Sequence, residues 1–160
     1  MMIRTINLFF IIFFLLSSKA YSLIEIDITR GNLDPLPIAV SPLFQDDNSK
    51  RNSINELKIE NVGSEISLVV ENNLKISGLF NPLSKEAFLQ KPDIAHLKPR
   101  FEDWALIKAQ ALITGKVKIE DKKLKVEFRL WDILAGREMM ALAFTTVPSN
   151  WRRVGHIISE

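Results

Sequence analysis

Two patterns along the chain predict an α/β domain, in which helices pack against a mixed sheet of roughly five strands. Segments with apolar residues at every second position alternate with segments in which apolar residues recur every three to four positions. Towards the carboxy terminus, three strand patterns then follow one another across short turns, which is typical of an antiparallel meander. Helices interleaved with strands, followed by a meander, indicate helices lying against one mixed sheet.

The amino-terminal stretch is predicted to be a leader. It begins with one positive side chain, Arg4, and no acid, continues with an uninterrupted apolar run over residues 8–16, and closes on an Ala-x-Ser site. This order is typical of a secretory signal peptide cleaved between Ser22 and Leu23. A membrane anchor is disfavoured, because a helix over the apolar run rises only about 14 Å and the hydrocarbon core is about 30 Å thick. We therefore expect one exported domain, residues 23–160, with no stable membrane span after cleavage.

Charge and cysteine content exclude several kinds of partner and chemistry. The chain has 21 Lys and Arg and 19 Asp and Glu, but Arg4 and Lys19 leave with the leader, so the remaining domain is formally neutral. A neutral domain has no general attraction to nucleic acid or anionic lipid, and the lysines of residues 116–125 are mixed with acids, as in a solvated hairpin. The absence of cysteine excludes disulfides, thiolate nucleophiles, cysteine-ligated metals and a lipid-modified amino-terminal cysteine.

The first half of the domain is expected to contain two strands, a loop and a helix. Residues 23–30 alternate apolar and polar side chains, and residues 37–40 are a short apolar run between prolines, so both are predicted as strands. Residues 44–61 are strongly polar and are interpreted as an exposed loop. An amphipathic helix follows, with Ser64 as its N-cap and Gly78 as its stop. Its apolar stripe is formed by Val62, Ile66, Val69, Val70 and Leu74.

The second half is expected to turn from helix to meander. Residues 79–83 are predicted as a short extended piece and residues 88–99 as irregular, before a helix over residues 101–110. The meander is predicted from strands at residues 111–117, 124–131 and 140–146. A last helix begins at Asn150 and reaches the chain end with neither a cap nor a polar tail, so we expect that the chain stops before its natural end.

Few side chains have the types and spacing of a catalytic or metal-binding site. His96 and His156 are far apart, with no carboxylate at ligand spacing. Glu102 and Asp103 are neighbours on a predicted helix and therefore do not face each other. The chain also lacks the nucleophile-elbow, phosphate-loop and zinc-protease motifs. No catalytic residue, metal ligand or cofactor is therefore assigned, and a non-enzymatic protein is favoured.

The tryptophans leave a second class of function open. Trp104, Trp131 and Trp151 have rings on which a ligand could stack, although such rings are more often core or interface anchors. The alternative to a protein-interaction domain is therefore a small-molecule or peptidoglycan-fragment binding domain that uses Trp104 or Trp131.

The amino terminus that cleavage creates is the candidate partner-binding segment. Its residues are Leu23, Ile24, Glu25, Ile26, Asp27, Ile28 and Thr29. A terminal strand can pair with the sheet of its own domain, or it can add to the exposed edge of a partner's sheet. Both hypotheses stay open from the residues alone, and they are compatible with each other.

Seven blocks of sequence carry a family resemblance. In chain order they read IDITRG, PIAVSPLF, SGLFNPL, FEDW, ALITGKV, VEFRLWD and WRRVGH, from residue 26 to residue 156. Together they resemble the amino-terminal domain of the TolB family, the periplasmic components of the Tol-Pal envelope system. The resemblance covers nearly all of the chain after the leader.

The resemblance implies a fold and a set of partners. The implied fold is a mixed-sheet α/β domain similar to anticodon-binding domains, followed by a carboxy-terminal propeller that this chain does not contain. Pal is expected to bind only through that propeller. Residues 23–29 match the segment that contacts TolA in the family and that moves between bound and free positions. The implied setting is the periplasm, with roles in outer-membrane integrity, constriction during cell division and macromolecule import.

Overall fold

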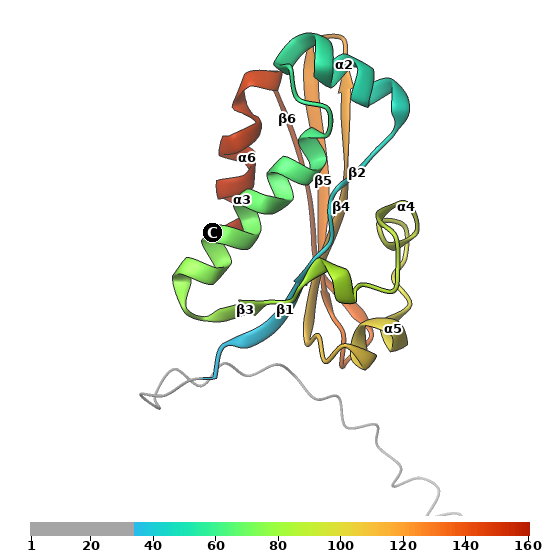
Figure 1. Cartoon of the computed structure of the whole chain (residues 1–160), viewed down its shortest axis with the longest axis vertical. Helices are drawn as coiled ribbons and strands as arrows, with labels where there is room; N and C mark the ends of the chain where they lie inside the picture. Colours follow the sequence, from blue (N-terminus) through green and yellow to red (C-terminus); the bar gives the residue numbers. More distant parts are fainter. Residues whose placement is uncertain (1–33) are drawn as a thin grey trace, which may run out of the picture.

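The structure, a computed structural model, describes residues 34–160 and contains one six-stranded mixed sheet. β3, β1, β4, β5 and β6 are hydrogen-bonded neighbours in that order, and β2 pairs with β4 beside this path. The predicted α/β fold with a mixed sheet is confirmed (Figure 1). The strands are β1 (Leu36–Val40), β2 (Phe44–Gln45), β3 (Phe80–Pro82), β4 (Ala111–Glu120), β5 (Lys123–Asp132) and β6 (Arg137–Thr146). The leader and the predicted strand at residues 23–30 lie outside the described residues.

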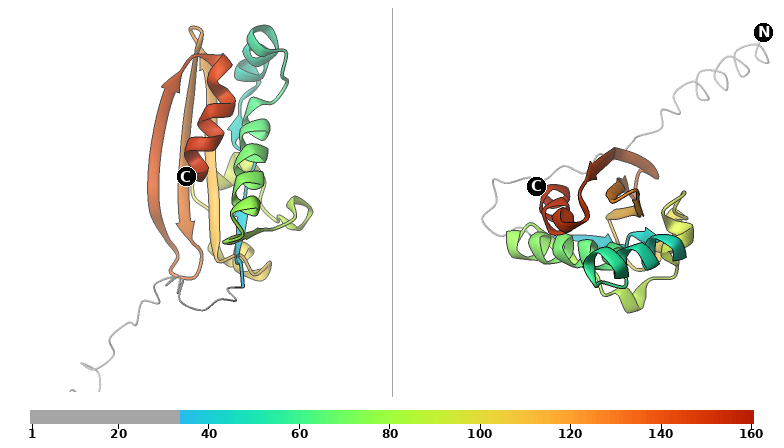
Figure 2. Two further views of the ribbon diagram at one scale, coloured as in Figure 1. Left: turned by 90° about the vertical axis from the view of Figure 1, so that its left-hand side faces the viewer. Right: turned by 90° about the horizontal axis from the view of Figure 1, so that it is seen from above.

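Helices lie on both faces of the sheet. The helices are α2 (Asp47–Leu57), α3 (Val62–Ser77), α4 (Pro92–Ala95), α5 (Phe101–Leu106) and α6 (Trp151–Ser159), with single 3-10 turns η1 (Lys85–Ala87) and η2 (Pro148–Asn150). α3 and α6 pack side by side over one face (Figure 2). α4 and α5 contribute side chains to a second, smaller core on the other face.

Alternation along β4 divides its side chains between the two cores. Ile113 and Val117 belong to the larger core with α3 and α6, whereas Leu112 belongs to the smaller core with Trp104 of α5. Successive side chains of a strand point to opposite faces, so one strand of period two supplies both layers. The sheet is therefore the shared wall of two apolar layers.

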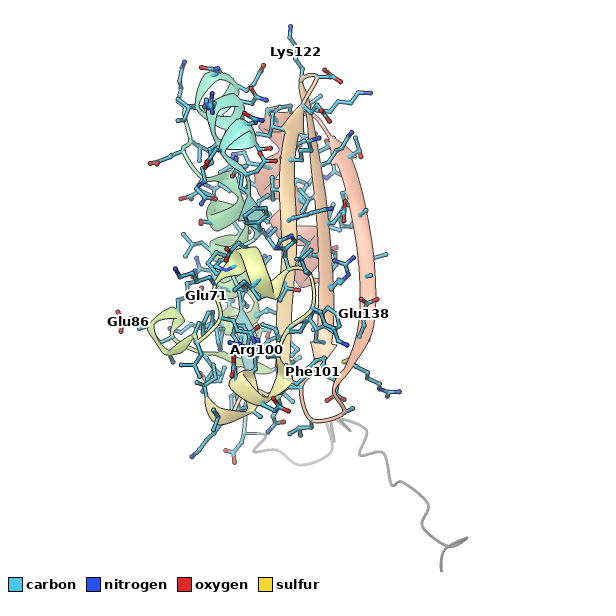
Figure 3. All side chains as sticks on the ribbon, turned by 90° about the vertical axis from the view of Figure 1, so that its right-hand side faces the viewer. Glu71, Glu86, Arg100, Phe101, Lys122 and Glu138 are labelled. Atoms are coloured by element: carbon cyan, nitrogen blue, oxygen red, sulfur yellow. The ribbon has the colours of Figure 1, made fainter. Side chains whose placement is uncertain are left out.

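The predicted meander is confirmed, and each of its strands is longer than expected. β4, β5 and β6 pair in succession as antiparallel neighbours. The β4–β5 turn consists of Asp121 and Lys122, whose φ angles are 52° and 57°, and Lys122 extends from the tip of the hairpin (Figure 3). Two successive left-handed residues form the tight hairpin turn whose twist matches that of the flanking strands. The pairing therefore continues to the ends of both strands, from Ala111↔Asp132 to Glu120↔Lys123.

The prediction that residues 44–61 form an exposed loop is wrong. Residues 44–45 form β2, and α2 follows from an N-cap at Asp46, whose carboxylate accepts a hydrogen bond from the Ser49 amide at 2.7 Å. The buried face of α2 is made of Ser49 and Ser53 rather than apolar residues. The Ile119 amide donates to Ser49 Oγ, and Asn52 Nδ2 donates to the Ile119 carbonyl, so polar bonds attach α2 to β4. A helix that packs through serines has no apolar period for a sequence pattern to reveal.

Two helix boundaries also differ from expectation. The predicted amphipathic helix is confirmed as α3, and Gly78 is its C-cap with φ of 72°, but the N-cap is Asn61 and not Ser64. Asn61 Oδ1 accepts from the Ser64 amide at 3.0 Å, so Ser64 is already inside the first turn. The helix predicted over residues 101–110 ends at Leu106, since Lys108 has φ of 62° and leaves the helical path. The predicted irregular stretch at residues 88–99 includes the single turn α4.

Candidate partner-binding surface

Two predictions fall outside the described residues: the partner-binding segment Leu23 to Thr29 and the cleavage site between Ser22 and Leu23. In the chain, this segment is followed closely by β1, which begins at Leu36. Leu36 lines an apolar groove on the face of the sheet that carries α3 and α6. Among residues 34–160, the apolar surface around this junction is therefore the candidate site.

The apolar groove has a volume of about 430 Å³ and is formed by one side of the sheet and the ends of two helices. Its floor comes from β1, β4, β5 and β6, and α6 forms one wall. The lining residues are Leu36, Ile38, Leu74, Phe80, Ala111, Ile113, Phe128, Leu130, Met139, Met140, Leu142, Ile157, Ile158, Ser159 and Glu160. α6 lies over part of this face of the sheet (Figure 2), and its last residues border the groove.

A β-bulge in β6 lies at the groove. The register of the β5–β6 pair shifts between Leu130 and Trp131, so that Leu130 is opposite Met140 while Trp131 is opposite Glu138. Met139 is the extra residue in β6, and both Met139 and Met140 line the groove. A bulge re-aims side chains that a regular strand would place on opposite faces. Two flexible methionine side chains, 52% and 47% exposed, therefore form one end of the surface.

The two edges of the sheet differ in their capacity to accept another strand. β3 is only three residues long and ends in Pro82, which has no backbone N–H. β6 is ten residues long, and from Met139 to Thr146 it contains neither a charged residue nor a proline. Long uncharged edges without proline are the ones that pair with a further strand. Among residues 34–160, β6 is therefore the edge best suited to strand addition.

The tryptophans do not form the ligand pocket that the alternative interpretation requires. Trp104 and Trp131 are 1% and 7% exposed and belong to the smaller core. Their ring N–H groups donate to Gln90 Oε1 at 3.2 Å and to Thr114 Oγ1 at 2.8 Å. Because these rings are buried and their polar atoms are satisfied within the domain, both tryptophans act as core anchors. The prediction that Trp104 or Trp131 stacks on a ligand is not supported by this arrangement.

Both histidines and Asp103 are engaged in local structural contacts. The His96 ring stacks on Phe44 with centroids 4.6 Å apart, and His156 Nδ1 lies 2.8 Å from Asn73 Nδ2. The Asp103 carboxylate accepts a hydrogen bond from the Gln90 side-chain amide and forms an ion pair with Arg100. Both contacts lower the pKa of the Asp103 carboxyl, and the Gln90 hydrogen bond has the larger effect. Within residues 34–160, no three His, Cys, Asp or Glu side chains come together as a metal site. Nor is any helix of that stretch both long and apolar enough to cross a bilayer.

Three lysines of the β4–β5 hairpin, Lys116, Lys118 and Lys125, lie next to acids, in line with the mixed charges of a solvated hairpin. Lys116 Nζ lies 3.3 Å from Glu127, and Glu120 accepts from Lys118 at 2.9 Å. The hydrogen bond and charge of Glu120 raise the pKa of Lys118. These side chains are about half exposed, so each pair contributes little to stability and the face remains solvated.

Comparison with known proteins identifies the family of this chain. The model of the TolB amino-terminal domain matches residues 24–139. A protein of Pelagibacter ubique strain HTCC1062, called Tol-Pal system protein TolB, is 72% identical over 151 residues, which are 94% of this chain and 34% of that protein. The chain belongs to the TolB amino-terminal domain family. It spans about a third of the length of this TolB relative.

Solved structures agree with the TolB assignment at the level of the fold. The crystal structure of TolB from Acinetobacter baumannii superposes with a TM-score of 0.60 at 20% identity, over 79% of this chain and 27% of that one. The lipoprotein GNA1162 from Neisseria meningitidis gives a TM-score of 0.50 at 16% identity, over 71% of this chain and 81% of that one. At these identities the two neighbours show a shared fold and nothing more.

Proposed function

We propose that this chain is a non-enzymatic adaptor of the Tol-Pal system that works in the periplasm through protein–protein contacts. The observation that carries the proposal is the 72% identity to a Tol-Pal system protein TolB over 94% of the chain. The secretory pattern of the leader supports a periplasmic location. The proposed roles are support of outer-membrane integrity, of constriction during division and of macromolecule import.

The proposed contact with TolA is made by Leu23 to Thr29, which add as a strand to an exposed edge of the TolA sheet. Main-chain hydrogen bonds would supply affinity in this mode, and pockets for alternate side chains would supply selectivity. Ile24, Ile26 and Ile28 lie at alternate positions and would fill such pockets. Pal is not assigned to this chain, because the family resemblance places Pal binding on a propeller outside it.

Capture of TolA by immobilised chain tests this proposal. We compare residues 23–160, the same protein without residues 23–30, and the triple variant I24D/I26D/I28D. The matched control E25Q/D27N changes only the polar side chains of the same segment. We expect TolA capture by the parent and the control and its loss in the other two proteins. Equal capture by parent and deletion would reject the proposed contact.

A further inference from the structure

We propose that two copies of this chain associate through their β6 strands, which pair antiparallel about a two-fold axis at Leu142 and join the two sheets into one. The inference goes beyond the proposed contact with TolA, because it concerns a different part of the domain and a second copy of the same chain as the partner. It is carried by three features of residues 34–160: the free edge of β6, the apolar side chains on one face of that edge, and the charges on the other face.

The edge of β6 specifies an extended occupant. β6 is the outermost strand on its side of the sheet (Figure 2), and among the described residues it has a strand neighbour only on its β5 side. Its other side therefore presents backbone N–H and C=O groups that an extended chain can satisfy in sequence. The stretch from Met139 to Thr146 has no charge and no proline that would interrupt such a ladder. The β6 strand of a second copy is an occupant of matching length.

Two-fold symmetry restricts how two β6 strands can pair. Strands related by a two-fold axis run antiparallel, and the same patch of each copy contacts the other. Residues that are opposite each other in an antiparallel pair have their side chains on the same face of the sheet. Since side chains alternate between faces, residues of even number must pair with even and residues of odd number with odd. The axis therefore passes through one residue and its own copy, and not between two residues.

An axis at Leu142 brings apolar side chains of the two copies together. Leu142 is then opposite its own copy, and Met140 is opposite Phe144 on the same face. Met140 and Leu142 line the apolar groove and are 47% and 48% exposed, so each would gain an apolar neighbour. The charged residues of β6 are confined to its first two positions, which would lie beside the uncharged end of the other β6 strand. The two strands therefore present no like charges to each other.

Charges on the other face of the sheet favour the same axis. In β5, Arg129 is opposite Ala141 and Glu127 is opposite Ala143. With the axis at Leu142, Ala141 is opposite Ala143 of the second copy, so Arg129 shares a row with Glu127 of the second copy. Symmetry repeats this row, and two small alanines separate the opposite charges in each. The Cα atoms of the two charged residues would be three strand spacings, or about 14 Å, apart.

A shift of the axis by one residue removes this complementarity. With the axis at Ala141, Arg129 shares a row with its own copy. With the axis at Ala143, Glu127 shares a row with its own copy, and Arg129 shares a row with Lys125 of the second copy. Like charges across an interface are unfavourable, and such charges act on register more than on affinity. Arg129 and Glu127 also keep ion pairs within their own copy, so we assign them the choice of register and not the strength of association.

Cysteine cross-linking tests the axis, because the protein has no cysteine of its own. The test variant is L142C in residues 23–160, the expected exported form. Opposed residues of an antiparallel pair have Cα atoms about 4.5–5.5 Å apart, within the range of a disulfide. The matched control is T145C on the same strand. Its two copies would be about 20 Å apart along the strand, because they are six residues out of register.

The reduced proteins are oxidised at equal concentrations, and covalent dimer is measured on non-reducing gels. We expect L142C to form the dimer at least about tenfold faster than T145C, because only residue 142 has disulfide geometry with its own copy. A141C and A143C are tested in parallel, since they report the two shifted axes, and both should be slower than L142C. Faster dimer formation at residue 141, 143 or 145, or equal rates at residues 142 and 145, would overturn the proposed pairing.

Sedimentation equilibrium of the cysteine-free protein measures association without a cross-link. We expect the parent to approach the mass of a dimer as its concentration rises. L142R should remain a monomer at concentrations where the parent is a dimer, because it places two like charges at the axis. The matched control is I76R, at an 84% exposed position in the last turn of α3, which leads into the opposite edge strand β3. I76R should associate as the parent does.

Circular dichroism verifies the fold of each variant, and the cross-linking rates decide the question if L142R does not fold. A parent that stays monomeric at every concentration, or a folded L142R protein that associates as the parent does, would overturn self-association through β6. None of these measurements uses TolA. Self-association and the TolA contact are therefore accepted or rejected separately.

Discussion

Single polar side chains decide where two helices begin and how they meet the sheet. Asp46 caps α2 and Asn61 caps α3, each through a side-chain oxygen that accepts from the amide three residues later. The Ser67 hydroxyl, buried in α3, accepts from the Leu43 amide and donates to main-chain carbonyls such as that of Ser41. Such bonds matter in a core because a buried polar group without a partner costs about 1–3 kcal/mol.

The position of the α3 cap can be measured by two substitutions. Asn61→Ala removes the oxygen that accepts from Ser64 and should lower the free energy of unfolding by about 1 kcal/mol. Ser64→Ala changes a first-turn residue whose amide, not its hydroxyl, makes the cap bond, and should change stability by less than about 0.5 kcal/mol. Urea denaturation followed by circular dichroism gives both values. The reverse order of effects would restore Ser64 as the cap.

Asp46 gives α2 a dependence on acid. The hydrogen bonds from Ser49 lower the pKa of the Asp46 carboxyl below its ordinary value of 3.8. A lowered folded-state pKa means that the stabilisation is complete above the unfolded-state pKa and is lost as the pH falls through the lower, folded-state value. We therefore expect Asp46→Ala to destabilise the domain at pH 7 and the gap from the parent to narrow below about pH 3.8. Urea midpoints from pH 7 to pH 2.5 measure the gap, and a constant gap would contradict the charge contribution.

Between elements, close backbone approach sets the packing of the two long helices. α3 and α6 meet at Gly155, where an added Cβ would lie 2.8 Å from the Cβ of Val69. The contact is made next to the buried side chains of Ile66 and Val154. A helix without a side chain at the crossing can pack more closely, and this contact orients α6 so that its last turn borders the groove.

Gly155→Ala should therefore weaken the α3–α6 contact. Overpacking of a tight site costs about 1–3 kcal/mol, and α6 would shift away from α3 to relieve it. Thermal unfolding of the variant should show a lower midpoint than the parent. Arg153→Ala, at an exposed position of the same helix, is the control and should leave the midpoint nearly unchanged. Equal midpoints for parent and Gly155→Ala would show that the crossing has room for a methyl group.

At the level of the entire chain, the domain combines a well-packed sheet with one open edge and one open groove. The two cores pack against opposite faces of β4. The short edge strand β3 ends in Pro82, which has no backbone N–H to offer a further strand. β6 and the groove beside it remain uncovered within residues 34–160. Exposed apolar grooves and free strand edges are both costly when they are left in contact with water.

Export of the intact chain has a simple test. We expect expression of the full chain to yield a periplasmic protein whose mass begins at Leu23, because the leader has the order of a cleavable signal. Replacement of Phe13 by Arg inside the apolar run should block export and leave the precursor mass. Intact mass spectrometry of fractionated cells measures both. A cytosolic parent protein that retains Met1 would remove the basis for a new amino terminus at the segment.

Repetition along the chain was sufficient to predict most elements of the fold. Alternation in Leu124, Val126 and Phe128 predicted β5, and the stripe from Val62 to Leu74 predicted α3, because a buried face imposes its period on the sequence. α2 escaped prediction because its buried face is Ser49 and Ser53. The partner-binding segment was predicted from the alternation of residues 23–29, which lie outside the described structure.

Local patterns thus predicted the type of most periodic elements, the leader and the family resemblance, since these depend on residues that are close together in the chain or on matching blocks. The strand order, the free edge of β6 and the groove depended on three-dimensional packing. Leu36, Leu74, Leu142 and Ile157 line one groove although they are far apart in sequence. No local pattern encodes this proximity, because the strands and helices that carry these side chains come together only when the sheet and helices pack.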